Sequence, residues 1–352
     1  MFDIVGKRYW YYLISAVVVV PGLISLILFG LNFSIDFTGG SILELQFHAS
    51  GVVQPAQLKE LFGEYGLGDT MVQSSTENIF LIRSKMLDAE TKRQIKEDIE
   101  DRFGAFTELR FESVGPAVGG EVQQRAYVVI AMAAVAILIY ISLAFRHVMN
   151  PIRYGACAII AMVHDILIVI GLASIFGVLR GWEVDALFLT ALLTVMGYSV
   201  HDSIVVFDRV RENSRRYAGR PIEEVVNHSI IQTLDRSINT QLTVVFTLFA
   251  LLLFGGITIR NFVLTLMIGI ISGTYSSIFN ASPLLVDWER RPDLLLYALS
   301  CVIPPVGLII GIYLAFRGSG RSQPWAKGCL LAALAGAVSI AGLFLLRGML
   351  VS

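Results

Sequence analysis

The sequence predicts a polytopic α-helical membrane protein that carries one small α+β domain outside the bilayer. Of its 352 residues, 55% are hydrophobic and only 16% are charged, and the mean hydropathy is +0.69. Soluble globular chains are about half apolar and a quarter charged, so the deficit of charge is the informative deviation. The second observation is a set of long apolar runs, each long enough for a helix across about 30 Å of hydrocarbon. These runs are 10–30, 126–145, 154–179, 186–207, 237–259, 262–286, 294–316 and 328–346.

The first run follows Lys7 and Arg8 and resembles a signal peptide in position. It has 21 uncharged residues and no small-x-small cleavage site, so it is predicted to be a retained anchor. Basic residues in short loops predict a cytoplasmic N-terminus, since twelve of them then lie inside and two, Arg180 and Arg260, outside. Three further basic residues in the loop between the last two runs break this rule, so the topology of 292–352 stays open.

The exterior domain is predicted at residues 32–121, a length sufficient for a small fold. Its strands and helices alternate in the order β-α-β-β-α-β, which is the pattern of a split βαβ, ferredoxin-like unit. The predicted elements are strand 41–48, helix 55–66, strands 69–75 and 78–84, helix 88–104 and strand 106–115. With 15 acidic and 8 basic residues, the segment has a formal charge of −7, which is typical of a solvated face. It contains no cluster of catalytic residue types.

Four parts follow from these predictions. Residues 1–31 form the first transmembrane helix and 32–121 the exterior domain. Residues 122–291 hold helices two to six, with a cytoplasmic loop at 208–236, and 292–352 form a C-terminal extension with two apolar segments.

Three charged residues interrupt or border the apolar runs. Asp165 is the twelfth residue of the run 154–179, and Asp202 lies five residues before Phe207, about 8 Å from the inner end of its helix. Arg236 lies at the inner end of the next span, so Asp202 and Arg236 are predicted partners on successive antiparallel helices. A carboxylate that can lose its arginine can bind and release a proton. From the pair alone, a proton switch and a static ion pair that fixes helix packing both stay open.

Weaker candidates surround these charges. His164 precedes Asp165, while His201 and Tyr198 lie near Asp202 on the same run; each could take part in proton transfer or be an ordinary packed side chain. No second His-Asp or Cys pair occurs at the spacing of metal ligands, so the sequence predicts no metal site and no cofactor. Three scattered cysteines indicate neither a disulfide framework nor a metal cluster.

A second hypothesis comes from a different class of protein. Asp165 and Asp202, on different helices, could form the dyad of an intramembrane aspartyl protease and share one proton. Their apparent depths differ, no Gly-x-Gly-Asp motif precedes either residue, and Arg236 would neutralise the dyad. These three observations count against the protease, which is kept as the alternative hypothesis.

Four stretches, in matching order and at matching spacing, carry a family resemblance over residues 1 to about 291. They read GLNFSIDFTGG at 30–40, VGPAVGGEVQQRA at 114–126, GYSVHDSIVVFDRVREN at 197–213 and LDRSINTQLT at 234–243. In these stretches the chain resembles the SecF branch of the SecD/SecF family of bacterial export proteins, which is related to the RND transporters. The resemblance implies a six-helix RND-type bundle, to which the segment 292–352 adds a two-helix extension without counterpart.

The resemblance also implies a function and partners. A chain of this kind pairs with SecD beside the SecYEG channel of the inner membrane, with YajC as a further partner and no nucleic acid. It is not an enzyme, and it uses the proton-motive force to promote export of unfolded polypeptides. The family's membrane aspartate falls on Asp202 and its arginine on Arg236, which favours the switch over the static pair. His201 departs from the asparagine that is common before that aspartate.

Glycines border the exterior domain on both sides. Because glycine absorbs backbone change at low steric cost, these stretches are predicted to be hinges that let the domain move, with tight turns as the plainer interpretation. The hinge candidates are Gly39, Gly40, Gly115, Gly119 and Gly120.

Overall fold

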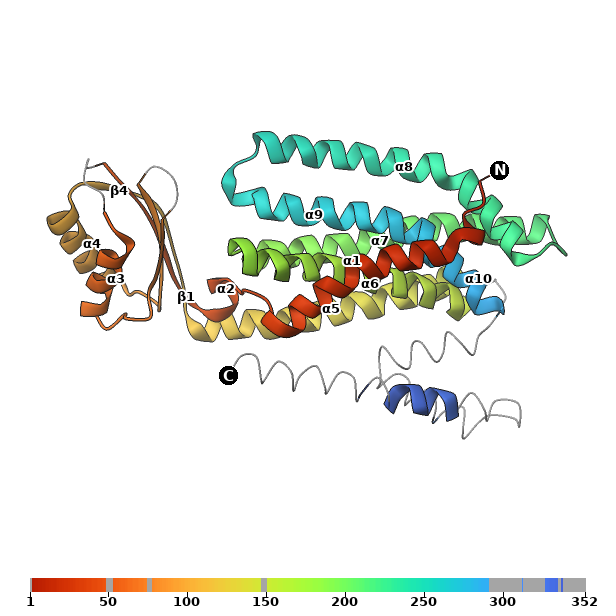
Figure 1. Cartoon of the computed structure of the whole chain (residues 1–352), viewed down its shortest axis with the longest axis horizontal. Helices are drawn as coiled ribbons and strands as arrows, with labels where there is room; N and C mark the ends of the chain where they lie inside the picture. The colour runs from red at the N-terminus through yellow and green to blue at the C-terminus, as the bar shows by residue number, and fades with distance from the viewer. Residues whose placement is uncertain are drawn as a thin grey trace. The chain divides into compact units, whose positions relative to one another are not determined.

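The computed structural model describes residues 2–48, 53–74, 78–146, 151–290, 312, 327–334 and 337. It divides into two compact units (Figure 1). The helical unit comprises Met1–Leu31, Met132–Trp182 and Thr190–Ser352, and the α+β unit comprises Asn32–Ala131 and Glu183–Leu189. The predicted extension 292–352 lies almost wholly outside the described residues.

Within the described residues, six helical segments are long and apolar enough to cross a membrane, which confirms the predicted spans up to residue 290. A short 3₁₀ turn, η1 (Val5–Lys7), leads into the first span, and a π-helical turn, η2 (Ser277–Ala281), joins the two helices of the last one. The helices are α1 (Arg8–Phe29), α5 (Pro116–Ala144), α6 (Pro151–Arg180), α7 (Ala186–Arg216), α8 (Ile222–Phe254), α9 (Ile257–Ser276) and α10 (Ser282–Arg290).

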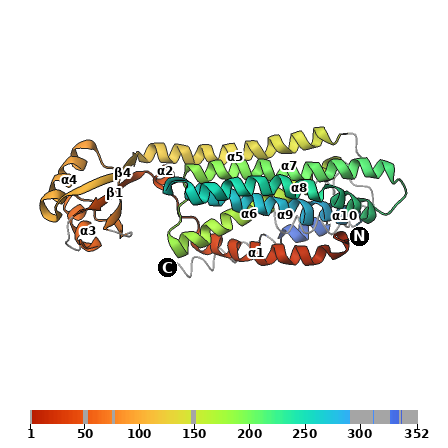
Figure 2. The same ribbon diagram turned by 90° about the horizontal axis from the view of Figure 1, so that it is seen from above.

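Small residues bring these helices together. Helix α1 packs on α6, α6 on α9 and α9 on α8 (Figures 1 and 2). At the α1–α6 contact, a Cβ added to Gly22 would lie 2.8 Å from the Cα of Gly171, closer than any side chain permits. One turn further along, the hydroxyls of Ser25 and Ser174 are 2.9 Å apart. Such close approach gives van der Waals contact and interhelical hydrogen bonds where no hydrophobic driving force exists.

The α+β unit has the predicted topology. Its strands are antiparallel neighbours in the order β2-β3-β1-β4, and two helices connect them, as in a ferredoxin-like fold. A four-residue helix, α2 (Ile35–Thr38), precedes the sheet. The other elements are β1 (Gly40–Phe47), α3 (Pro55–Glu64), β2 (Met71–Ser74), β3 (Ile79–Ser84), α4 (Ala89–Phe103) and β4 (Phe106–Val114).

One hydrophobic core holds the sheet and both helices of this unit together. Leu43 and Leu45 of β1, Phe62 of α3 and Ile95 and Ile99 of α4 are all buried in it. Apolar residues on α4 recur four apart, so a helix with a strongly polar sequence still offers one apolar stripe to the sheet.

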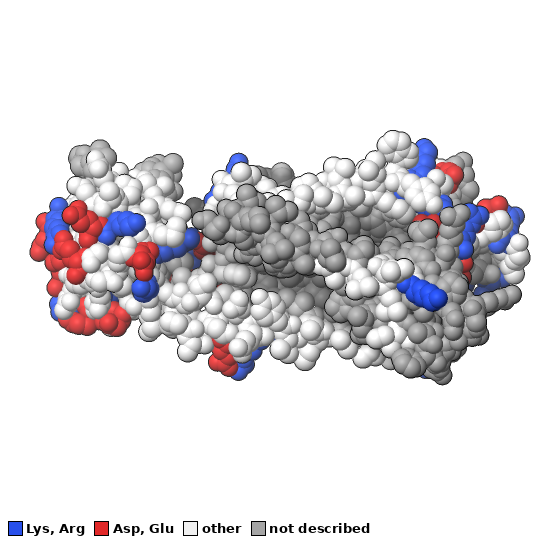
Figure 3. Space-filling model, turned by 60° about the horizontal axis from the view of Figure 1, so that its bottom comes forward, with Lys and Arg blue, Asp and Glu red and all other residues white. Residues whose placement is uncertain are grey.

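Acidic and basic side chains gather on the face of the α+β unit that Figure 3 shows. Lys92 and Lys96 of α4 each donate a hydrogen bond of 2.8 Å to Glu108 of β4. Burial raises the pKa of the Glu108 carboxyl, but these two ammonium groups outweigh burial and hold the pKa below its usual value.

Candidate functional site

Asp165 lies at the centre of the helical unit, fully buried on α6. Its Oδ2 accepts hydrogen bonds of 2.6 Å from the hydroxyls of Ser199 and Ser276. Its Oδ1 accepts one of 2.6 Å from Ser272, and the Nδ1 of His164 lies 3.0 Å from the same oxygen. An ionised carboxylate has room for about four hydrogen bonds. Asp165 therefore has a complete set of donors, supplied by α6, α7 and α9.

Further serines extend this polar network between α7 and the last span. The Ser203 hydroxyl lies 3.1 Å from that of Ser277, which in turn donates to the carbonyl of Ser199 at 3.1 Å. Ser277 opens the π-helical turn η2, and single π turns inside α-helices frequently occur at functional sites.

On its other side, His164 borders a small cavity. Its Nε2 lies 3.3 Å from Nδ2 of Asn280, which also donates to the hydroxyl of Ser15 at 2.8 Å. These three residues and Tyr12 line a cavity of about 180 Å³. His164 is thus held on both ring nitrogens, by Asp165 and by Asn280, and it belongs to the hydrogen-bonded support of Asp165.

Asp202 has far fewer hydrogen-bond donors around its carboxylate than Asp165 has. It is 2% exposed, on α7, and accepts one hydrogen bond, 2.6 Å long, from Nε2 of Gln241 on α8. The amide oxygen of Gln241, Oε1, is buried and has no hydrogen-bond partner among the described residues. Sequence reasoning missed Gln241, although a glutamine within the apolar run 237–259 is a signal that could have found it.

The predicted direct pairing of Asp202 with Arg236 is wrong in this structure. Arg236 is exposed on α8 and makes no ion pair among the residues that the structure describes. Five residues separate it from Gln241, which at 100° per residue places the two side chains about 140° apart around the helix. His201 is exposed as well, and Tyr198 is half-buried. The parts that Asp202, Arg236, His201 and Tyr198 play in proton transfer stay predictions.

The two buried aspartates have no hydrogen-bond donor in common. Asp165 is bonded to serines of α7 and α9 and to His164, while Asp202 is bonded to Gln241 of α8. A protease dyad needs two carboxyl groups that share one proton, and the oxygens of Asp165 are already occupied. Within the described residues, no group of three or more His, Cys, Asp or Glu side chains could hold a metal ion.

The hinge candidates fall into two groups by environment. Gly39 has φ +73°, and a Cβ there would lie 2.6 Å from the Cα of Pro116, so only glycine fits. A Cβ on Gly119 would lie 2.7 Å from the nitrogen of Gly39, and Gly40 has φ +128°. Gly115 and Gly120 have no such contacts, and a Cβ on Gly120 would meet nothing within 4 Å. Close packing alone therefore accounts for Gly39 and Gly119, and the hinge role of the five stays a prediction.

Comparisons with known proteins place these features in one family. Residues 94–291 match the family described as "Protein export membrane protein SecD/SecF, C-terminal", and residues 24–50 match "SecD/SecF GG Motif". The chain is 52% identical over 291 residues to a protein translocase subunit SecF of Anaerolinea thermophila, covering 82% of this chain and 94% of that protein. It is 49% identical over 309 residues to the SecF subunit of Thermobaculum terrenum, covering 84% and 97%.

A solved structure agrees with this assignment. The crystal structure of SecDF, a translocon-associated membrane protein from Thermus thermophilus, is similar with a TM-score of 0.71 at 34% identity. The similarity covers 82% of this chain, which spans 39% of the length of that SecDF chain.

Proposed function

The chain belongs to the SecD/SecF family, as a SecF subunit of the SecDF translocase accessory complex for protein export, and on that premise we propose that it couples the proton-motive force to export through Asp202. It is a multi-pass protein of the bacterial cell membrane and a transporter-like subunit rather than an enzyme. The intramembrane protease is therefore set aside.

The contrast between the two buried carboxylates carries the proposal. Asp165 has four hydrogen-bond partners, so its charge is compensated within the bundle whatever the rest of the protein does. Asp202 is almost as deeply buried and has one partner among the residues that the structure describes. An intramembrane charge with so little compensation is costly, and binding a proton removes that cost. Asp202 is consequently the carboxylate whose protonation can change during a transport cycle, while Asp165 is structural.

The exposed face of α8 supports a partnership with SecD. Arg236, Thr240, Thr243 and Thr247 recur every three or four residues along this face. Eighteen residues separate Arg236 from the end of α8 at Phe254, which is about 27 Å of helix and places the guanidinium near the inner edge of the hydrocarbon. A charged side chain there requires a partner or water. In the proposed complex, helices of SecD cover this face, and Arg236 acts with Asp202 only in that assembly.

The remaining assignments extend the same proposal. The N-terminus is cytoplasmic, so the loop 208–236 lies inside and the domain 32–121 outside, where it contacts the unfolded polypeptide. The complex acts beside the SecYEG channel, with YajC as a further partner. Movement of the exterior domain about the glycine stretches 30–40 and 114–120 transmits the effect of protonation to the exported chain.

Inverted membrane vesicles that contain the complex with SecD test the role of Asp202. Asp202→Asn keeps the shape of the side chain and removes titration, so we expect export without a gradient to be unchanged and the stimulation by a proton gradient to be lost. Asp208→Asn, which removes an exposed carboxylate from the same helix, is the matched control and should retain the stimulation. Wild-type stimulation in the inserted Asp202→Asn protein would refute the proposal.

A further inference from the structure

Helix α8 carries a line of buried polar residues that leads away from Asp202. Ser229, Thr233, Ser237 and Gln241 are spaced four residues apart and are at most 8% exposed. Each step of four residues turns about 40° beyond a full turn, so the four side chains follow a shallow spiral that moves about 120° around the helix over about 18 Å of its length. The line ends at Gln241, which donates to Asp202. These four residues are called the α8 polar line below.

Two of the four have polar atoms that nothing satisfies. Ser229 donates to the carbonyl of Val225 at 2.7 Å and Thr233 to that of Ser229 at 3.0 Å, as hydroxyls in helices commonly do. By contrast, the Ser237 hydroxyl and the Gln241 Oε1 are buried and have no partner in the described part of the chain. Buried polar atoms without a protein partner are where proteins hold ordered water.

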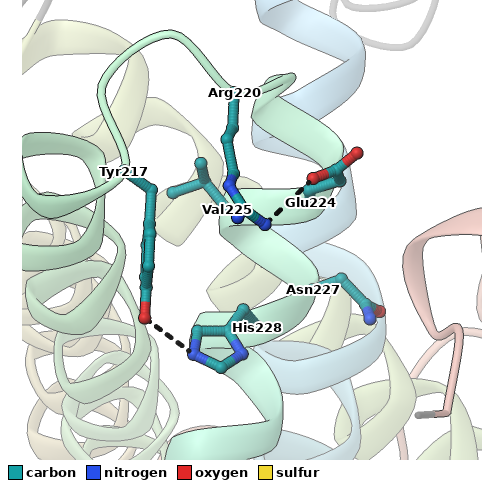
Figure 4. A pocket seen from close by; sticks show the side chains of 6 residues that line it. All are labelled: Tyr217, Arg220, Glu224, Val225, Asn227 and His228. Atoms are coloured by element: carbon teal, nitrogen blue, oxygen red, sulfur yellow. Dashed lines mark hydrogen bonds and ion pairs between the residues drawn. The ribbon is translucent and has the colours of Figure 1, made fainter.

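The other end of the line meets a cavity at the end of the α7–α8 hairpin (Figure 4). This cavity has a volume of about 480 Å³, and its lining includes Tyr217, Val225 and His228. The Tyr217 hydroxyl lies 3.3 Å from the Nε2 of His228, so titratable groups stand at this end. Val225 precedes Ser229 by one turn on the same side of α8, so the cavity and the α8 polar line adjoin.

We propose that a row of water molecules along the α8 polar line carries protons between Asp202 and the cavity at His228. The proton leaves the carboxyl oxygen of Asp202 for the nearest water, and each water passes one proton to the next, so the only protein bond broken is the O–H of Asp202. Hydroxyls of α8 hold this row, and at its inner end Asn213 of α7, which is fully buried, donates to the Ser229 hydroxyl at 2.9 Å. The inference rests on the proposed role of Asp202 and adds the route and its inner end.

The charged groups near this seam lie outside the α8 polar line. His201 on α7 and Asp235 and Arg236 on α8 are exposed, and Arg209 on α7 is half-buried and donates to Gln232 at 2.6 Å. The route therefore depends on neutral hydroxyl and amide groups. If the same residues served only to let α7 and α8 approach, their hydroxyl oxygens would be dispensable.

Thiol reactivity tests whether the seam holds water. Ser237→Cys is introduced after Cys157, Cys301 and Cys329 are replaced by alanine, and the complex with SecD is placed in inverted vesicles. A small, membrane-impermeant methanethiosulfonate is added to the exposed cytoplasmic face. Because only a hydrated thiol ionises and reacts, we expect Ser237→Cys to react at least about tenfold faster than Leu248→Cys, a buried position on the same helix. Equal rates at the two positions would overturn the proposal.

A pair of isosteric variants tests the hydroxyl itself. Threonine and valine have the same shape, so Ser237→Thr and Ser237→Val fill the same space and differ in one oxygen. We expect the threonine variant to keep the gradient-dependent stimulation of export and the valine variant to lose half of it or more, with equal export in the absence of a gradient. Equal stimulation in the two variants would overturn the route while leaving Asp202 as the proton site. Undiminished stimulation in Asp202→Asn would instead remove the premise, whatever the reactivity at position 237.

Discussion

Replacing Asp165 by asparagine should destabilise the helical unit much more than the same replacement at Asp202. The amide oxygen of an asparagine accepts about two hydrogen bonds, and its nitrogen accepts none. Two of the four partners of Asp165 would thus lose their acceptor. Hydrogen bonds to a charged group contribute about 1.5–3 kcal/mol each, so the expected loss is about 3–6 kcal/mol. At position 202 the amide oxygen still accepts from Gln241, and the expected loss is about 1 kcal/mol.

Thermal unfolding of the purified complex in detergent measures this difference. Cys157 is fully buried on α6, so a thiol-reactive fluorescent dye reports when the helices separate. At about 2–4 °C per kcal/mol for a unit of this size, Asp165→Asn should lower Tm by at least about 6 °C, and Asp202→Asn by less than about 4 °C. Equal Tm values would refute the assignment of Asp165 to structure. Unchanged stability of Asp165→Asn with selective loss of gradient-driven export would make Asp165 the proton site instead.

Three further changes test packing and charge. Gly22→Leu should separate α1 from α6, because no side chain fits against the α6 backbone, and it should lower the yield of folded protein in detergent by chromatography. Gly39→Ala should destabilise by about 1–3 kcal/mol through backbone strain while Gly120→Ala is neutral; equal effects on stability and export would favour hinges over close packing. Glu108→Gln should reduce the stability of the α+β unit by up to about 1 kcal/mol. Because the folded-state pKa of Glu108 is depressed, that contribution is present above about pH 4.3 and lost as the pH falls through the folded-state value. Protease resistance against pH measures it, and an unchanged acid profile in the variant would contradict the assignment.

Local patterns in the sequence determine most of the fold. Apolar runs near 20 residues predict the six spans of the described chain because hydrocarbon thickness sets their length. In the α+β unit, period-two and period-four patterns locate each strand and helix, and the short connections leave few ways to order four strands. These are properties of neighbouring residues, which is why the sequence alone contains them.

The candidate site depended on tertiary structure in two respects. Composition located both buried aspartates, since a carboxylate in an apolar run is conspicuous. The donors to Asp165 were not predictable, because Ser199, Ser272 and Ser276 lie 34 to 111 positions away and resemble ordinary packing residues. Helix packing alone determines which serines of α7 and α9 face α6.

The partner of Asp202 shows the same division. Depth in the membrane can be counted along a sequence, and by depth Arg236 and Asp202 belong together. Rotation of α8 about its own axis cannot be counted in this way, because it is fixed by the surfaces that α8 buries. Ser237 and Gln241 turn inward at the level of Asp202, and Arg236, about 100° from Ser237 and about 140° from Gln241, turns outward there. The sequence determined that a charged aspartate would be buried here, and the packing of α8 decided that an amide would meet it.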